Sequence, residues 1–171
     1  VFPFVSVVAV SLKKIAACLA KGTTRIVNAA REPEISDLGK CLIAMGAKIS
    51  GLGSSEITIE GVTSLHGADY RVMPDRIEAG TYAIAAAIAG GEVELVGASP
   101  DTIASLTSLL IKSGAEVSAT PRGLNVQMNG SRPRANDVTT APYPGFPTDL
   151  QAQIMALLAV ADGTSVIREK I

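Results

Sequence analysis

An internal repeat is the feature that most restricts how this chain can fold. Two long segments match when one is shifted by about 68 residues, as from Gly46 to Gly114. The first contains AKGTTRIVNA, REPEISDLGKCLIAMGAKIS and SEITIEG, and the second contains AGGEVELVGA, SPDTIASLTSLLIKSGAEVS and RGLNVQM. Each predicts a helix ending in a glycine turn, a β-branched strand, and an amphipathic helix that stops at a left-handed glycine. A hairpin follows in each copy, pairing 47–50 with 56–60 and 115–119 with 123–128.

A third copy opens at residue 138 with VTTA, continues through TDLQAQIMALLAVADG and closes with TSVIREKI. The repeating unit is therefore β-α-β-α-β-β, present about two and a half times. The helices that open the second and third copies, at 76–89 and 149–161, are apolar nearly all round after their first turn. Such helices are buried, so the sheets must lie outside them. We therefore expect an α/β fold in which repeats surround buried helices.

Composition excludes several classes of function. The formal net charge is −1, and the cluster SRPRAND at 131–137 has two arginines and no aromatic residue, so nucleic acid is a poor candidate partner. Cys18 and Cys41 form no CxxC pair, and with one histidine, His66, they cannot assemble a zinc site. We expect buried thiols in a reducing cytoplasm and His66 in a loop. The apolar run at 83–89 is too short to span a membrane, and the N-terminal segment reverses the charge order of a secretion signal.

Acidic residues at predicted helix starts have two interpretations. Asp149 lies in TDLQ, directly after a segment with three prolines that would hold the turn rigid. The pattern fits a capping box, and any helix favours an acid in its first turn, so capping is the simpler interpretation from the residues alone. Asp75 and Glu78 repeat this spacing one copy earlier, next to Arg76. Glu32 and Glu34 precede the second helix of their repeat, as capping residues or as the wall of a cleft.

Several motifs in fixed order resemble one family of enzymes. They are NAAREPEI (28–35), LIAMGAKISG (42–51), PDRIEAGTYAIAAAI (74–88) and TAPYPGFPTDLQAQ (140–153). Together they are similar to UDP-N-acetylglucosamine enolpyruvyl transferases, which begin bacterial peptidoglycan synthesis. The resemblance implies an inside-out α/β barrel of three repeats in each of two domains. It also implies an internal portion of a longer protein: residues 1–73 are expected to be the last part of the first domain, and 74–171 the first half of the second.

The resemblance also implies a reaction and its site. Enolpyruvyl would move from phosphoenolpyruvate to the sugar 3-hydroxyl of UDP-N-acetylglucosamine by addition and then elimination of phosphate, with no metal or organic cofactor. Asp149 matches the family aspartate proposed as the base for that hydroxyl, which reverses the preference for capping. Asp75, Arg76 and Glu32 remain cleft or structural residues. Ile171 matches a residue that contacts the nucleotide sugar, largely through its main chain.

The N-terminal segment departs from the family. Val5, Ser6 and Val7 match the stretch whose backbone and serine hold the diphosphate of the nucleotide sugar, but Phe4 and Val8 stand where the family has lysine and glycine. Phe4 cannot supply the positive charge of the lysine, and Val8 lacks the conformational freedom of glycine. An apolar strand over residues 4–10 is therefore the safer prediction. The family's proton-donating cysteine or aspartate would lie upstream of residue 1. We therefore expect the 171-residue chain alone to be inactive, with a non-catalytic fragment or binding module as the alternative function.

Overall fold

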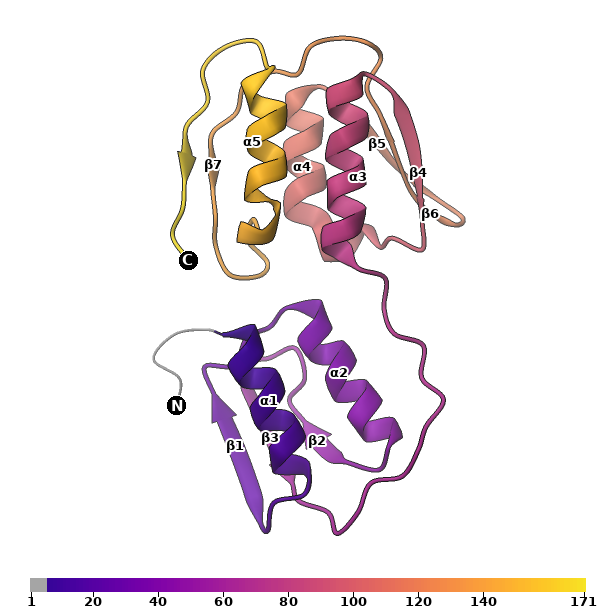
Figure 1. The fold of residues 1–171 in the computed structure, drawn as a ribbon, viewed down its shortest axis with the longest axis vertical. Coiled ribbons are helices and arrows are strands. Elements are labelled where there is room, and N and C mark those ends of the chain that lie inside the picture. Colours follow the sequence, from indigo (N-terminus) through magenta and orange to yellow (C-terminus); the bar gives the residue numbers. More distant parts are fainter. Residues whose placement is uncertain (1–5) are drawn as a thin grey trace. The chain divides into compact units, whose positions relative to one another are not determined.

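A computed structural model describes residues 6–171, and the chain divides into two compact units, Val1–Met73 (unit 1) and Pro74–Ile171 (unit 2). Each is described by itself (Figure 1). Val5 and the four residues before it lie outside the described residues.

Unit 1 holds two helices on a three-stranded antiparallel sheet of order β1-β3-β2. Its elements are α1 (Val7–Cys18), β1 (Thr23–Val27), α2 (Pro33–Ala44), β2 (Lys48–Ser50) and β3 (Glu56–Glu60). The central strand pairs on both sides, since Glu60 lies opposite Thr23 on one edge and opposite Lys48 on the other. The predicted hairpin is therefore confirmed, and it places β3 between the strands that precede it in the chain.

Unit 2 repeats this arrangement. It contains α3 (Arg76–Ala89), β4 (Glu92–Val96), η1 (Pro100–Ile103), α4 (Ala104–Ser113), β5 (Glu116–Thr120) and β6 (Gly123–Gln127). The strand order β4-β6-β5 and the antiparallel pairing match those of unit 1. Gly46 and Gly114 follow equivalent helices with φ of +100° and +109°, which a side chain rarely adopts. The predicted repeat and its glycine caps are therefore confirmed.

The third copy has a parallel pair of strands in place of the antiparallel sheet. β7 (Val138–Thr139) leads through η2 (Thr148–Leu150) and α5 (Gln151–Ala159) to β8 (Ile167–Arg168), and β7 lies parallel to β8. Figure 1 shows α3, α4 and α5 side by side, between this pair and the three-stranded sheet. The helices of unit 2 thus lie inside and the strands outside, as the sequence predicts.

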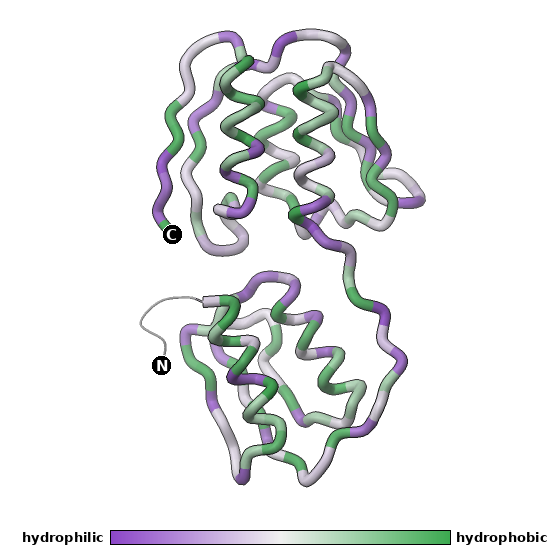
Figure 2. The backbone as a smooth tube through the Cα atoms, in the orientation of Figure 1, coloured by the Kyte–Doolittle hydropathy of each residue, from purple (hydrophilic) through white to green (hydrophobic). Residues whose placement is uncertain are grey.

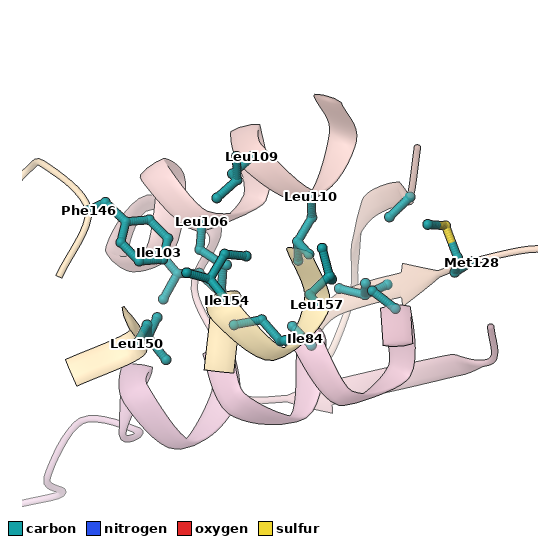
Figure 3. Close-up of a cluster of buried hydrophobic side chains, with 14 of the residues drawn as sticks. Ile84, Ile103, Leu106, Leu109, Leu110, Met128, Phe146, Leu150, Ile154 and Leu157 are labelled. Carbon is teal, nitrogen blue, oxygen red and sulfur yellow. The ribbon is translucent and has the colours of Figure 1, made fainter. Parts of the chain in front are cut away.

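The core of unit 2 is formed mainly by these helices. Hydrophobic residues run along all three (Figure 2). Ile84, Leu106, Ile154 and Leu157 are each at most 1% exposed and point into one cluster (Figure 3). Burial is restricted to the inner faces, however: the prediction that α3 and α5 are buried all round is wrong for their outer faces. Tyr82 is 57% and Met155 48% exposed, because no described element of unit 2 covers these faces.

The predicted strand over residues 4–10 is also wrong in its described part, because residues 7–10 open α1. Ser6 is the N-cap, and its Oγ accepts a hydrogen bond of 3.3 Å from the amide of Ala9. Valine-rich sequence favours a strand locally, but Val10, Ala17 and Cys18 recur at helical spacing and are buried against the sheet. Tertiary burial therefore outweighs the local preference. Lys14 shares this inward face and is fully buried.

The cap predicted at Asp75 is confirmed. Its Oδ1 accepts hydrogen bonds from the amides of Ile77 (2.8 Å) and Glu78 (3.1 Å), two of the donors that the first turn of α3 leaves unpaired.

We expect Asp75→Ala to destabilise the protein by about 1 kcal/mol, the usual cost of losing an N-cap side chain. Urea unfolding followed by circular dichroism measures this change. Asp75→Asn keeps an acceptor oxygen and should recover most of the loss. Equal stabilities of the alanine variant and the parent would contradict a capping role.

Candidate functional site

The proline-rich segment before η2 is tied to its surroundings at several points. The amide of Ala141 donates to the carbonyl of Phe146 at 2.9 Å, and Phe146 points into the hydrophobic core (Figure 3). Two hydrogen bonds join the segment to α4 and η1: Ser105 Oγ at the start of α4 donates to the carbonyl of Gly145 (3.2 Å), and Tyr143 Oη donates to the carbonyl of Asp101 in η1 (3.3 Å). The segment therefore delivers the chain to η2 on a fixed path, as its prolines predict.

Asp149 is the middle residue of η2 and is exposed, whereas its neighbour Leu150 is 1% exposed and lies in the core. The short helix is thus anchored on one side and presents a carboxylate to solvent on the other. Among the described residues no hydrogen bond to the Asp149 carboxylate is found. A carboxylate held by its backbone but without a partner for its oxygens suits contact with a ligand hydroxyl.

The capping-box interpretation of residues 148–151, which the family resemblance made the less favoured one, is wrong. Pro147 occupies the N-cap position of η2 and makes no side-chain cap. The Thr148 hydroxyl, which a capping box would use for backbone amides, instead donates to Glu169 Oε2 at 2.7 Å. An ionised carboxylate accepts a stronger hydrogen bond than a neutral group does. Because Glu169 is 21 residues from Thr148 in the sequence, no local sequence pattern predicts this contact.

Glu169 is the residue at the centre of this cluster, and sequence reasoning missed it. It follows β8 directly, as Thr140 follows β7, and the parallel pairing brings these two strand ends together. The Thr140 hydroxyl donates to Glu169 Oε1 at 2.7 Å and accepts from the amide of Lys170 at 2.9 Å. Hydrogen bonds from Thr140, then Thr148 and the Ile171 amide, hold the pKa of the Glu169 carboxyl below its usual range.

Ile171 belongs to the same cluster. Its amide donates to Glu169 Oε1 at 2.7 Å, and its side chain is 62% exposed. The structure therefore brings Ile171 and Thr148, the residue before Asp149, to one carboxylate. Ile171 follows the carboxyl end of β8, and Asp149 lies in the short helix that precedes α5.

Arg76 lies at the start of α3 and is 7% exposed. Its guanidinium lies 5.8 Å from the centre of the Tyr143 ring, a cation–π contact. Arg76, Tyr143, Pro147 and Leu150 help to line a cavity of about 20 Å³, room for about one water molecule. Arg76 thus supports the proline-rich segment from inside unit 2.

The remaining candidates belong to unit 1. Ser6 caps α1 and Val7 is its first residue, while Val5 lies outside the described residues. Glu32 occupies the N-cap position of α2 but makes no side-chain cap, so the capping interpretation of Glu32 is wrong. Its side chain is 8% exposed, and Oε2 has no hydrogen-bond partner in the described part of the chain. The following Pro33 has no amide hydrogen, so the first turn of α2 offers one donor fewer to a capping side chain.

The two cysteines are free and lie in helices, and His66 lies in a loop, all as predicted. Cys18 is buried, but Cys41 is only half-buried, so the prediction of two buried thiols holds for the first alone. None of the described helices is both long and apolar enough to cross a membrane.

Comparison of the chain with known proteins identifies a family. The model of the family EPSP synthase (3-phosphoshikimate 1-carboxyvinyltransferase) matches residues 1–171. The UDP-N-acetylglucosamine 1-carboxyvinyltransferases of Paracoccus denitrificans and Afipia carboxidovorans are 58% and 56% identical over 170 residues, 99% of this chain. The chain spans only 40% of the length of either relative.

A solved structure shares the fold. The enolpyruvyl transferase NikO from Streptomyces tendae matches with a TM-score of 0.80 and 26% identity, over 94% of this chain and 39% of its own. The α/β repeats with inward helices are therefore part of the inside-out barrel that the sequence predicts. With the family model matched along its whole length, the chain belongs to the EPSP synthase family of enolpyruvyl transferases.

Proposed function

We propose that this chain is a portion of an enzyme that transfers enolpyruvyl from phosphoenolpyruvate to the 3-hydroxyl of UDP-N-acetylglucosamine, in peptidoglycan synthesis. The observation that carries the proposal is the 52–58% identity, over nearly the whole chain, to relatives named UDP-N-acetylglucosamine 1-carboxyvinyltransferase. Because the chain spans about 40% of those relatives, the activity is that of a longer polypeptide. Residues 1–73 would be the last part of its first domain, and 74–171 the first half of its second.

Asp149 is the proposed base. It would take the proton of the sugar 3-hydroxyl as that oxygen adds to the enol carbon of phosphoenolpyruvate, while an acid elsewhere in the longer polypeptide protonates the methylene carbon. Loss of a proton from that carbon and departure of phosphate then restore the double bond. The exposed position of the Asp149 carboxylate on an anchored helix start supports this role. Without the acid and the phosphate-binding cations, the 171-residue chain should not turn over.

Further contacts with the nucleotide sugar are proposed for Ser6, Val7 and Ile171. We assign the diphosphate to the backbone and side chain around Ser6 and Val7, at the start of the 12-residue helix α1, where amide groups favour an anion. Ile171 would contact the sugar. The free thiols of Cys18 and Cys41 are in keeping with a reducing cytoplasm.

Binding of UDP-N-acetylglucosamine to this chain tests the proposed substrate. We expect millimolar UDP-N-acetylglucosamine to raise the melting temperature, because a ligand at 100 times its dissociation constant adds about 2.7 kcal/mol to folding stability. Differential scanning fluorimetry measures the shift, and GDP-mannose at the same concentration is the control. No shift, or an equal shift with GDP-mannose, would contradict the assignment of nucleotide-sugar contacts to these residues.

A further inference from the structure

We infer that Glu169 is a positioning residue, whose carboxylate holds Asp149 and Ile171 in one arrangement toward the sugar. The naming of the sugar rests on the proposed function, whereas the arrangement itself rests on contacts within unit 2.

The first step is the number of donors that Glu169 receives. Three groups donate to its two oxygens, each at 2.7 Å: the hydroxyls of Thr140 and Thr148 and the amide of Ile171. They come from the end of β7, the start of η2 and the segment after β8. Hydrogen bonds to an ionised carboxylate are shorter and stronger than those between neutral groups. A single side chain thus joins three segments, in addition to the backbone pairing of β7 with β8 and the contacts of Asp137 with Val166 and Arg168.

The second step is what each contact fixes. Thr148 adjoins Asp149 in η2, a helix of three residues with no side-chain cap, so the Thr148–Glu169 bond holds the first turn from outside. On the opposite side, the Ile171 amide bends back onto Glu169 Oε1, which directs the amide away from any ligand. Only the Ile171 carbonyl and side chain are then left to make contacts.

The third step is the anchoring of Glu169 itself. Thr140 is fully buried, and its hydroxyl connects the Lys170 amide to Glu169 Oε1. The Thr140 amide also donates to the carbonyl of Arg168 at 3.0 Å, which continues the parallel pairing. The exposed Glu169 side chain is therefore held by the buried Thr140 hydroxyl. A side chain that orients another residue must itself be held in place in this way.

The experiment measures backbone order at Asp149 and Ile171 by ¹⁵N relaxation of the 171-residue chain. In Glu169→Ala we expect the order parameters at both residues to fall from about 0.85 toward 0.6 or below, with the rest of unit 2 unchanged. Glu169→Gln can still accept with its oxygen and donate to Thr148 with its amide, so it should restore order at both residues. Affinity for UDP-N-acetylglucosamine, by calorimetry, should fall about tenfold in Glu169→Ala and recover in Glu169→Gln.

Glu94→Ala is the matched control. Glu94 accepts from the Thr120 hydroxyl at 2.9 Å and pairs with Arg122 in the other sheet of unit 2. We expect it to lower stability without changing order at Asp149. Should Glu169→Ala fail to fold, Thr148→Val removes one hydroxyl, and it should loosen Asp149 while Ile171 stays ordered; Thr148→Ser should behave as the parent.

The outcomes separate this inference from the proposed function. Parental order at Asp149 in both Glu169→Ala and Thr148→Val would overturn the positioning role. Loss of order in these variants, with no binding of nucleotide sugar by the parent chain, would support the positioning role and count against the proposed function.

Discussion

Asp149→Asn is expected to lower kcat by about 10²- to 10⁴-fold, the usual contribution of a general base. The assay needs a complete active site, which a hybrid supplies: these 171 residues replace the matched segment of the Paracoccus denitrificans enzyme, which is 58% identical to them. Asparagine has nearly the same shape as aspartate but cannot accept the proton of the sugar hydroxyl. Release of phosphate from phosphoenolpyruvate, in the presence of UDP-N-acetylglucosamine, measures turnover.

The control must separate a base from an acid that merely stabilises a helix start. Asp101 lies in the first turn of η1 and is exposed, as Asp149 is in η2. If Asp149 serves only the helix dipole, Asp101→Asn and Asp149→Asn should lower stability alike and leave kcat near that of the parent hybrid. We expect a large loss of turnover in Asp149→Asn alone. Near-normal turnover in that variant would remove Asp149 from the role of base.

The repeat and its local signals could be predicted from the sequence because each depends on neighbouring residues. The glycines at 46 and 114 end helices by backbone conformation, and Asp75 caps the amides of residues two and three positions later. Alternating strands beside short turns predict hairpins for the same reason. The repeat also made the tertiary arrangement predictable, because two copies of one sequence pattern favour the same packing of helices and strands.

The Glu169 cluster could not be predicted in this way. Its contacts join residues 21 and 29 positions apart, and they depend on the parallel register of two strands of only two residues each. TDLQ fits a capping box whether or not Thr148 has another acceptor, so the pattern predicted the wrong partner. The strand predicted at the start of α1 is wrong for a similar reason: the valines favour a strand locally, but burial of the helical face that includes Val10, Ala17 and Cys18 favours the helix.

Lys14→Met is expected to stabilise the protein by about 2–3 kcal/mol at pH 7. Lys14 is 0% exposed and lies among Val10, Ala17 and Cys18 on the inward face of α1, with Nζ donating to the carbonyl of Ile35. Burial lowers the pKa of Lys14 from its usual 10.5 to about 8, although the neighbouring Cys18 opposes this shift. Methionine has similar length without a charge to desolvate. Urea unfolding at pH 7 measures the gain.

The pH dependence distinguishes removal of a buried charge from better packing. Below pH 8 both the folded and the unfolded chain carry the Lys14 proton, and the folded state bears the full cost of burying it. Between about pH 8 and 10.5 the unfolded chain binds more protons at this site, so the stability contributed by Lys14 rises with pH, and the advantage of Lys14→Met shrinks. Lys40→Met, at an exposed position of α2, should change stability at pH 7 by less than about 0.5 kcal/mol. An advantage of Lys14→Met that stays constant from pH 7 to 10.5 would show that packing, and not the buried ammonium group, determines the effect.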